Sequence, residues 1–292
     1  MAIIQQADFV ETDFARYNCV SFIGAPQDDS VLFVGQKIAQ LINNLEPVRQ
    51  CLVFIEEGVE VPARLVQQHN FVLCASAIRG YALFAQRIAQ QEMAQEHRVG
   101  HTLTPQGYYI GKDVTLGENV LIEPGVLLGH GVSIGSGSII RAHSVIRWAT
   151  IGANCLIKSH AVIGDQAFTL YTDGDGHPRR VFCLGSVQIE HDVEVGSFTT
   201  VCRGQNTATT VGAYSKLDDH VHVGHDVVIG QNTLIAAGAI IGGYNQFGDD
   251  VYMGMNATTK QLISIESGAF IPMGARVGKD VKAQGMFGAP QS

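Results

Sequence analysis

An aliphatic residue stands at every sixth position of IGKDVTLGENVLIEPGVLLGHGVSIGSGSII (Ile110–Ile140). Glycine or an acidic residue often follows it directly, as at Gly111 and Glu123, and a small or aliphatic residue comes four positions later, as at Val114. A period of six matches neither an amphipathic helix nor an alternating strand. It is typical of a triangular coil with three short strands per turn, each turning one aliphatic side chain inward. Glycine then occupies corners where a positive φ or a close approach of the backbone excludes a side chain.

Three repeats complete a turn of about 18 residues, so each residue is expected to stack on the one a full turn away. The series continues, with one shortened step, to Val277. Polar, glycine-rich residues interrupt it between Asp165 and Ser186, and a shorter insertion lies between Arg203 and Thr210. We predict a mainly β protein, with a parallel β-helix over residues 101–288 and an inserted loop at 165–186. Solenoid insertions tend to lie on the binding face, so this loop is expected to cover a neighbouring subunit; a surface loop without function is the alternative.

Residues 1–100 lack the six-residue period. The segments SVLFVG (Ser30–Gly35) and QCLVFI (Gln50–Ile55) have the composition of buried strands. Helices are expected between them, at Gln36–Asn44, and later, at Gly80–His97. Strands that alternate with helices predict a small α/β domain.

The composition excludes several classes of protein. Of the 292 residues, 46% are hydrophobic and 16% charged, which is typical of a folded chain. The formal net charge is −8 without a basic cluster, so nucleic acid is not an expected partner. No apolar run reaches the roughly 18 residues that span a bilayer, and the first residues show no secretory signal. The six cysteines have no paired or zinc-type spacing, so we expect reduced thiols, a cytoplasmic protein and no metal.

Three histidines, His220, His222 and His225, lie within six residues. His225 comes two positions after the inward Val223, so its side chain is expected to face outward at a corner. An imidazole titrates near neutral pH, as a general base should. A surface or capping role is the alternative for each of the three.

The repeats resemble those of the left-handed β-helix acyltransferases. Within this family the chain looks most like the UDP-3-O-acylglucosamine N-acyltransferases of lipid A synthesis and related N-acyltransferases that act on nucleotide-linked amino sugars. The resemblance rests on CASAIRGYALFAQRIAQ (Cys74–Gln90), VIGDQAFTLYTDGDG (Val162–Gly176), SFTTVCRG (Ser197–Gly204), LDDHVHVGHDVVIG (Leu217–Gly230) and AAGAIIGG (Ala236–Gly243). The chain departs from the family where a second histidine is expected, near Leu262, and beside Phe33, where Gln36 and Ala39 replace the usual partners.

The resemblance implies an N-acyltransferase of surface glycan or lipid A type synthesis, with His225 as the catalytic base. It also points to Gly243, a full turn later, whose N–H would stabilise the oxyanion. Asp219 is expected to orient an imidazole or bind the sugar amine, and the alternative is an ordinary corner residue. His222 is expected to contact substrate or to be structural, and the role of His220 is open.

Further residues follow from the same resemblance. The nucleotide sugar would bind near Phe33, with Tyr171, Asp173, His177 and Arg180 of the inserted loop. The acyl donor, an acyl-CoA or an acyl carrier protein, would lie along the last turns near Lys260, Arg276 and Lys279. For Phe33 the alternative is a core residue, and for the basic residues a solvated surface. No permanently bound cofactor is expected. A homotrimer is expected, because adjacent coils form the cleft in this family.

Two other functions remain open. A γ-type carbonic anhydrase shares the coil, and the spacing of His220 and His225 suits two metal ligands. His191 is then the nearest candidate for a third ligand. The other alternative is a non-catalytic β-helix that binds or scaffolds.

Overall fold

The computed structural model describes residues 3–5, 17 and 19–283. Contacts divide the chain into two compact units. The first comprises residues 1–95, 168–185 and 205–207, and the second residues 96–167, 186–204 and 208–292. The predicted β-helix boundary, residue 288, lies outside the described residues. No helix in the described part of the chain is long and apolar enough to cross a membrane.

The first unit is built on a five-stranded parallel sheet with the order β1-β5-β4-β3-β2. Its strands are β1 (Ile3–Gln5), β2 (Cys19–Val20), β3 (Ser30–Val34), β4 (Leu52–Glu56) and β5 (Asn70–Cys74). Its helices are the 3₁₀ helix η3 (Gln36–Leu45), α1 (Ala63–Val66) and the long α2 (Ala77–Val99), whose last residues belong to the second unit. Strands β3 and β4 are nearly continuous apolar runs because parallel strands are covered on both faces. The predicted α/β character is therefore confirmed, and the first predicted helix is a 3₁₀ helix interrupted at Ile38.

Most of the inserted segment belongs to the first unit. There β17 (Leu170–Thr172) pairs antiparallel with β18 (Pro178–Arg180). Val181 is fully buried, and Tyr171 and Phe182 pack against the same apolar cluster as Phe54. The tip of this hairpin is polar and exposed, whereas its base contributes to a hydrophobic core.

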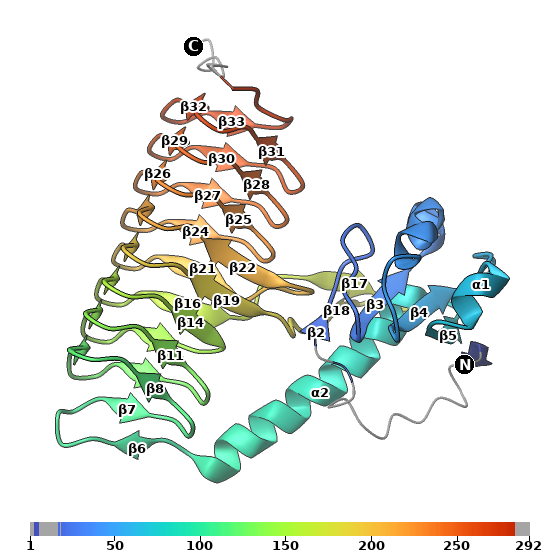
Figure 1. The fold of residues 1–292 in the computed structure, drawn as a ribbon, viewed down its shortest axis with the longest axis horizontal. Coiled ribbons are helices and arrows are strands. Elements are labelled where there is room, and N and C mark those ends of the chain that lie inside the picture. Colours follow the sequence, from blue (N-terminus) through green and yellow to red (C-terminus); the bar gives the residue numbers. More distant parts are fainter. Residues whose placement is uncertain (1–2, 6–16, 18, 284–292) are drawn as a thin grey trace. The chain divides into compact units, whose positions relative to one another are not determined.

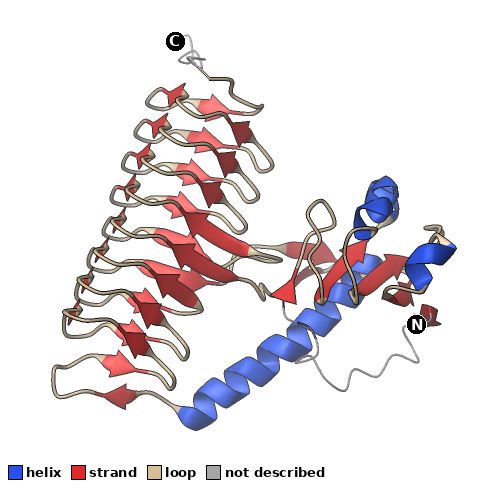
Figure 2. Ribbon diagram, in the orientation of Figure 1, coloured by secondary structure: helices blue, strands red, loops and turns tan. Residues whose placement is uncertain are grey.

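The second unit is a triangular coil whose three faces are parallel sheets, except that β6 pairs antiparallel with β7 at the start of the first sheet (Figures 1 and 2). Sheet I consists of β6 (Thr102–Leu103), β7 (Tyr109–Ile110), β10 (Leu127–Leu128), β13 (Val145–Ile146), β16 (Val162–Asp165), β21 (Thr200–Cys202), β24 (His222–Val223), β27 (Ile240–Ile241), β30 (Thr258–Thr259) and β33 (Arg276–Val277). Sheet II consists of β8 (Thr115–Leu116), β11 (Ser133–Ile134), β14 (Ala149–Ile151), β19 (Ser186–Ile189), β22 (Ala208–Val211), β25 (Val228–Ile229), β28 (Gln246–Phe247) and β31 (Ser264–Ile265). Sheet III consists of β9 (Leu121–Ile122), β12 (Ile139–Ile140), β15 (Leu156–Ile157), β20 (Glu194–Val195), β23 (Lys216–Leu217), β26 (Leu234–Ile235), β29 (Tyr252–Met253) and β32 (Phe270–Ile271).

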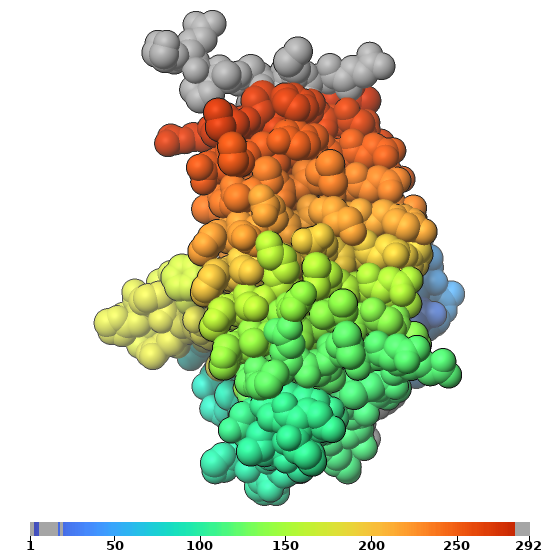
Figure 3. Space-filling model, turned by 90° about the vertical axis from the view of Figure 1, so that its left-hand side faces the viewer, coloured from blue at the N-terminus to red at the C-terminus, as the bar shows by residue number. Residues whose placement is uncertain are grey.

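Successive coils stack in the register that the repeat predicts. Val223 pairs with Ile241, and Ile229 pairs with Phe247, so the step is 18 residues. The step is 38 residues from Ile163 to Val201, where the long segment is inserted, and 22 from Val201 to Val223. Both insertions therefore leave the stack in register, and the space-filling view shows adjacent coils in direct contact (Figure 3). The prediction of a parallel β-helix is confirmed.

The three corners of each coil are named here by the sheets they join. Glycines that directly follow an inward aliphatic residue have no room for a side chain, since a Cβ at Gly111 would lie 2.7 Å from the backbone nitrogen of His130. The positive φ occurs two residues further on, at Asp113 and Asn119 for example. The close approach of the next coil's backbone thus explains the glycine that directly follows the inward residue. The residue with positive φ is often Asn, Asp or an aromatic residue and not glycine.

The buried cysteines behave as core residues. Cys51, Cys74 and Cys155 are buried and form no disulfide with another described residue. Burial raises the pKa of the Cys74 thiol to about 11 and raises that of the other two, so all three are protonated at neutral pH. Cys183 and Cys202 are also buried.

One inward position of sheet I is polar. Thr259 replaces the aliphatic residue, and its Oγ1 accepts hydrogen bonds from Asn245 Nδ2 and, at 3.0 Å, from the Gly242 N–H. Asn245 Oδ1 in turn accepts the Ile263 N–H at 2.7 Å. Both side chains are buried. This polar pair therefore fixes the backbone at Gly242, directly before Gly243.

We expect Thr259→Val to lower the free energy of unfolding by about 1–3 kcal/mol, because it removes the acceptor of buried donors. Denaturant unfolding of the purified protein measures the change. Thr258→Val is the matched control, since Thr258 lies on the outward side of the same strand and is only half-buried. Equal stability of the two variants would show that the buried pair contributes nothing.

A candidate catalytic corner at His225

His225 lies at the I–II corner between β24 and β25. Its Nδ1 lies 2.9 Å from Asp226 Oδ2, and the two side chains are 13% and 2% exposed. A carboxylate accepts hydrogen bonds, so Nδ1–H donates and Nε2 of the neutral ring carries the lone pair. The Tyr244 ring, which lies nearly perpendicular to the imidazole at a centroid distance of 4.9 Å, also restrains it. The corner holds a base in a defined tautomer.

Because Gly243 has no side chain, the His225 imidazole can occupy the space beside it. A Cβ at position 243 would lie 2.7 Å from His225 Nε2 and 2.9 Å from Cε1, so only glycine permits this ring position. The Gly243 N–H makes no hydrogen bond to another described residue. At the equivalent position of other corners a side chain accepts this hydrogen bond, as Ser136 does from Glu118 at 3.0 Å and Asp249 does from Gln231 at 2.8 Å. A backbone donor is thus available beside the base.

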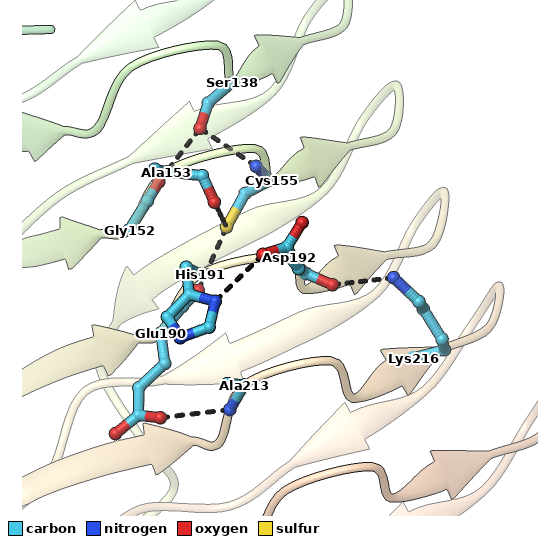
Figure 4. A network of polar contacts seen from close by, with 9 residues as sticks. All are labelled: Ser138, Gly152, Ala153, Cys155, Glu190, His191, Asp192, Ala213 and Lys216. Carbon is cyan, nitrogen blue, oxygen red and sulfur yellow. Dashed lines mark hydrogen bonds and ion pairs between the residues drawn. The ribbon is translucent and has the colours of Figure 1, made fainter.

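The chain contains a second His–Asp pair that serves as an internal comparison (Figure 4). At a II–III corner His191 Nδ1 lies 2.9 Å from Asp192 Oδ2, and the Tyr214 ring packs nearly perpendicular to the His191 ring. These side chains are 50% and 35% exposed, and Ala213 stands where the first pair has Gly243. The shared feature is the hydrogen bond; burial and the adjacent glycine distinguish His225.

The other two histidines of the cluster lie elsewhere. His222 points outward from sheet I, and the surrounding protein lowers its pKa by desolvation. His220 lies at the III–I corner, where its ring stacks on Phe198 at 5.2 Å. That stack continues through His160, at 4.9 Å from Phe198, to His143. None of these rings contacts His225 within the chain.

Asp219 also lies at the III–I corner, so the structure does not bring it to His225 in the same chain. Its Oδ1 lies 2.5 Å from Lys158 Nζ and accepts the Ser197 N–H at 2.7 Å. The hydrogen bond from Lys158 holds the pKa of the Asp219 carboxyl below its usual range. Sequence reasoning missed Asp226, the carboxylate that His225 actually contacts; its place directly after the histidine was the only signal.

The histidines do not assemble a metal site within one chain. His191, His220 and His225 occupy three different corners, and the described residues contain no group of three His, Cys, Asp or Glu side chains arranged for a metal ion. His220 and His225 lie at opposite ends of β24, so their spacing in the sequence does not bring them together as metal ligands within one chain.

The basic residues predicted for the donor lie on or next to the His225 edge. Lys260 comes directly after β30 in the sequence. It stacks above Gly242, because Thr258 pairs with Ile240 in the next coil. Lys279 follows β33, three coils above His225, or about 14 Å at the usual strand spacing. Arg276 is the outward residue of β33. All three are exposed.

The predicted nucleotide residues all belong to the first unit. Phe33 is half-buried and packs on Tyr81 at 5.2 Å, and Tyr171 packs against the same cluster. Asp173 forms an ion pair with Arg79 at 2.8 Å, which fixes the hairpin. His177 and Arg180 are exposed on the hairpin. Arg79 was missed because it lies far from Asp173 in the sequence.

Comparison with known proteins supports the repeat assignment. The bacterial transferase hexapeptide model, described as six repeats, matches residues 113–147 and 208–243. UDP-3-O-acylglucosamine N-acyltransferase of Pseudomonas aeruginosa (strain LESB58) is 40% identical over 88 residues, or 30% of this chain and 25% of that protein. The enzyme of the same name from Rhodopseudomonas palustris (strain BisB5) is 42% identical over 91 residues, or 31% and 25%. The matched part of the chain thus spans a quarter of these relatives.

Solved structures agree on the fold. LpxA from Acinetobacter baumannii has a TM-score of 0.58 and 25% identity, over 65% of this chain and 72% of that one. UDP-N-acetylglucosamine acyltransferase from Bacteroides fragilis 9343 has a TM-score of 0.55 and 27% identity, over 62% and 68%. The repeats, the sheet topology and these matches identify the second unit as a left-handed parallel β-helix.

Gly243→Ala is expected to displace the imidazole, because its Cβ overlaps the ring position. The free energy of unfolding should fall by about 1–3 kcal/mol, as for other overpacked sites. Denaturant unfolding and the imidazole nitrogen signals of His225 in NMR measure the two effects. The control is Gly278→Ala, where a Cβ meets no atom within 4 Å. An unchanged His225 signal in Gly243→Ala would contradict the packing described above.

Proposed function

We propose that this chain, whose left-handed β-helix carries bacterial transferase hexapeptide repeats, is an N-acyltransferase that transfers an acyl group from a thioester to the amine of a nucleotide-linked amino sugar. The names of its relatives support acyl transfer to a UDP-linked sugar. The observation that carries the proposal is the buried His225–Asp226 pair, with Nε2 directly beside Gly243. The second pair, at His191, has the same hydrogen bond without this burial or the glycine.

The reaction needs one base and one oxyanion donor. His225 Nε2 accepts a proton from the acceptor nitrogen as this nitrogen attacks the thioester carbonyl. The N–C bond forms, and the negative charge that develops on the carbonyl oxygen is stabilised by the Gly243 N–H. When the C–S bond breaks, the protonated imidazole returns its proton to the sulfur. Asp226 keeps the ring in the required tautomer and stabilises its charged form, as the carboxylate of a catalytic triad does.

Two further groups of residues complete the proposal. The donor, an acyl-CoA or an acyl carrier protein, lies along the His225 edge with its phosphates or acidic groups near Lys260, Arg276 and Lys279. The nucleotide sugar contacts Phe33, Tyr171, Asp173, His177, Arg180 and His222. The active assembly is a homotrimer and needs no permanently bound cofactor.

A matrix of acceptors and donors tests the proposal. UDP- and dTDP-linked amino sugars are combined with acyl-CoA and acyl carrier protein donors, and mass spectrometry detects the mass added by the acyl group. An acceptor that binds should also raise the melting temperature by ligand linkage. Binding without any product across the matrix would favour the non-catalytic alternative.

His225→Ala is expected to abolish turnover, because it removes the base, and to leave the oligomer intact. His191→Ala is the matched control, since it removes the exposed histidine of the other pair. Steady-state rates of both variants, with native mass spectrometry of their assemblies, make the comparison. Should His225→Ala retain a tenth of the wild-type rate, the base assignment is wrong.

Lys260→Glu together with Lys279→Glu is expected to raise KM for acyl-CoA by about 10-fold or more, through lost phosphate contacts worth roughly 1.4 kcal/mol. The value of kcat should change little, because neither side chain serves as the proposed base or oxyanion donor. Lys282→Glu is the control, since Lys282 already pairs with Glu266 at 2.7 Å. An equal rise in KM in the control would mean that net charge alone, not this edge, attracts the donor.

A further inference from the structure

The outward row of sheet III changes from charged to apolar side chains along the coil. Glu194 lies on β20 and Lys216 on β23, and the row continues with Leu234, Tyr252 and Phe270 on the next three strands. The last three side chains are 46%, 38% and 44% exposed. Large apolar groups that remain exposed beside charged ones on a preformed surface are typical of a binding site.

A hollow of about 230 Å³ lies over Leu234 in this row. Leu234 is shorter than its neighbours in the row, Tyr252 and Lys216, and Ala236 lowers the adjoining III–I corner. Longer side chains therefore form the walls of the hollow, namely those of Glu194, Lys216, Asp218 and Tyr252. Its volume is below the roughly 300–1,000 Å³ of sites for drug-sized ligands, so it suits a smaller molecule.

Tyr252 turns one face of its ring toward the hollow. The other face stacks on the ring of Phe270 in the coil above, with centroids 5.2 Å apart and planes at 8° to each other. Because the two rings stack along the coil, the uncovered face of Tyr252 is turned toward Leu234, one coil below. The hollow thus has an aromatic platform at one end, which can pack against the C–H groups of a ring-shaped ligand.

The polar wall combines hydrogen-bond acceptors with one donor group. Lys216 Nζ donates to the Asp192 carbonyl oxygen at 2.7 Å, which fixes the ammonium near the II–III corner and leaves two further N–H groups (Figure 4). Asp218, near the III–I corner, accepts the Asp219 N–H at 2.8 Å through Oδ1. Glu194 lies one coil below Lys216, and its carboxylate accepts no hydrogen bond from another described residue. A ligand here meets both donors and acceptors.

We propose that this hollow binds a neutral saccharide, with the C–H side of a sugar ring on Tyr252 and Leu234 and its hydroxyls on Glu194, Lys216 and Asp218. A hydroxyl both donates and accepts, so a sugar uses carboxylates and an ammonium at the same time. Hydrogen bonds to ionised groups are the stronger ones. The two carboxylates outnumber the one ammonium, which disfavours nucleotides, coenzyme A and other anions.

The saccharide site is separate from the His225 corner within the chain. Sheet III borders the II–III and III–I corners, whereas His225 lies at the I–II corner on the other side of the triangle. A sugar in the hollow therefore contacts neither His225 nor Gly243 of the same chain. The site does not rest on the proposed function, and its binding can be measured without any assay of turnover.

Saturation-transfer NMR of the full chain tests the site. The ligands are methyl α-glucoside, N-acetylglucosamine and its β-linked disaccharide, with glucose 6-phosphate as the anionic comparison. We expect a neutral sugar to bind with a Kd of about 1 mM, as suits a shallow site, and glucose 6-phosphate to bind more weakly. Tyr252→Ala should weaken binding of the neutral sugar about 3- to 10-fold through loss of the ring face. Tyr252→Phe, which keeps the ring, should bind as the wild type does.

Two further variants serve as controls and should leave the Kd unchanged. Gln246→Ala removes an exposed outward side chain from sheet II, and His225→Ala alters the catalytic corner. No binding of any neutral sugar, or an equal loss in Tyr252→Ala and Gln246→Ala, would overturn the proposal. So would tighter binding of glucose 6-phosphate that depends on Tyr252. A changed native mass of Tyr252→Ala without sugar binding to the wild type would show a contact between copies instead. None of these results bears on turnover, so the proposed function stands or falls separately.

Discussion

Hydrogen bonds between backbone groups one coil apart are the constraint on which the second unit depends. The ladder that joins Val223 to Ile241 repeats around every turn, so each side chain is held directly above its counterpart in the coil below. Inward positions must therefore be filled by similar aliphatic side chains along the whole stack. The polar exception at Thr259 is tolerated because Asn245 and the Gly242 N–H satisfy it in the interior. Insertions are accommodated only where the chain leaves the stack and returns in register.

The same ladder aligns residues that are one repeat turn apart in the sequence along one edge of the coil. His225 and Gly243 are one coil apart, and Lys260 and Lys279 continue the same edge toward the end of the coil. Because the scaffold is made of short strands and tight corners, the His225 imidazole and the Gly243 amide have little freedom to separate. In general, a hydrogen-bond donor held in place beforehand can stabilise developing charge without reorganisation. The edge thus holds the His225–Asp226 pair, the Gly243 N–H and the basic residues Lys260 and Lys279 on one rigid surface.

The two His–Asp pairs separate what the sequence implies from what the environment decides. Both histidines precede an aspartate and contact a tyrosine ring in a T-shaped arrangement, so the local pattern is the same. The pair at His225 is withdrawn from water, which strengthens a charged hydrogen bond, whereas the pair at His191 is half-exposed. The pairs also differ in the residue one coil above the ring, which is Gly243 at His225 and Ala213 at His191. The residue one coil above each histidine, Gly243 for His225 and Ala213 for His191, therefore distinguishes the two pairs better than the presence of a histidine cluster in the sequence.

The sequence alone determined the β-helix, its register, the outward position of His225 and the role of Gly243 as its neighbour, because a strict period fixes which residues stack. It also predicted two strands of the first unit, β3 and β4, from apolar runs. It did not reveal that the inserted segment forms a hairpin of the first unit, that Asp226 is the partner of His225, or that Asp219 pairs with Lys158 at another corner. Whether these residues meet depends on how deeply each one is buried and on which corner of the coil it occupies. Only the tertiary structure decides them, because hydrogen bonds and ion pairs depend on the conformation of each side chain and on the groups packed around it, which a six-residue period does not encode.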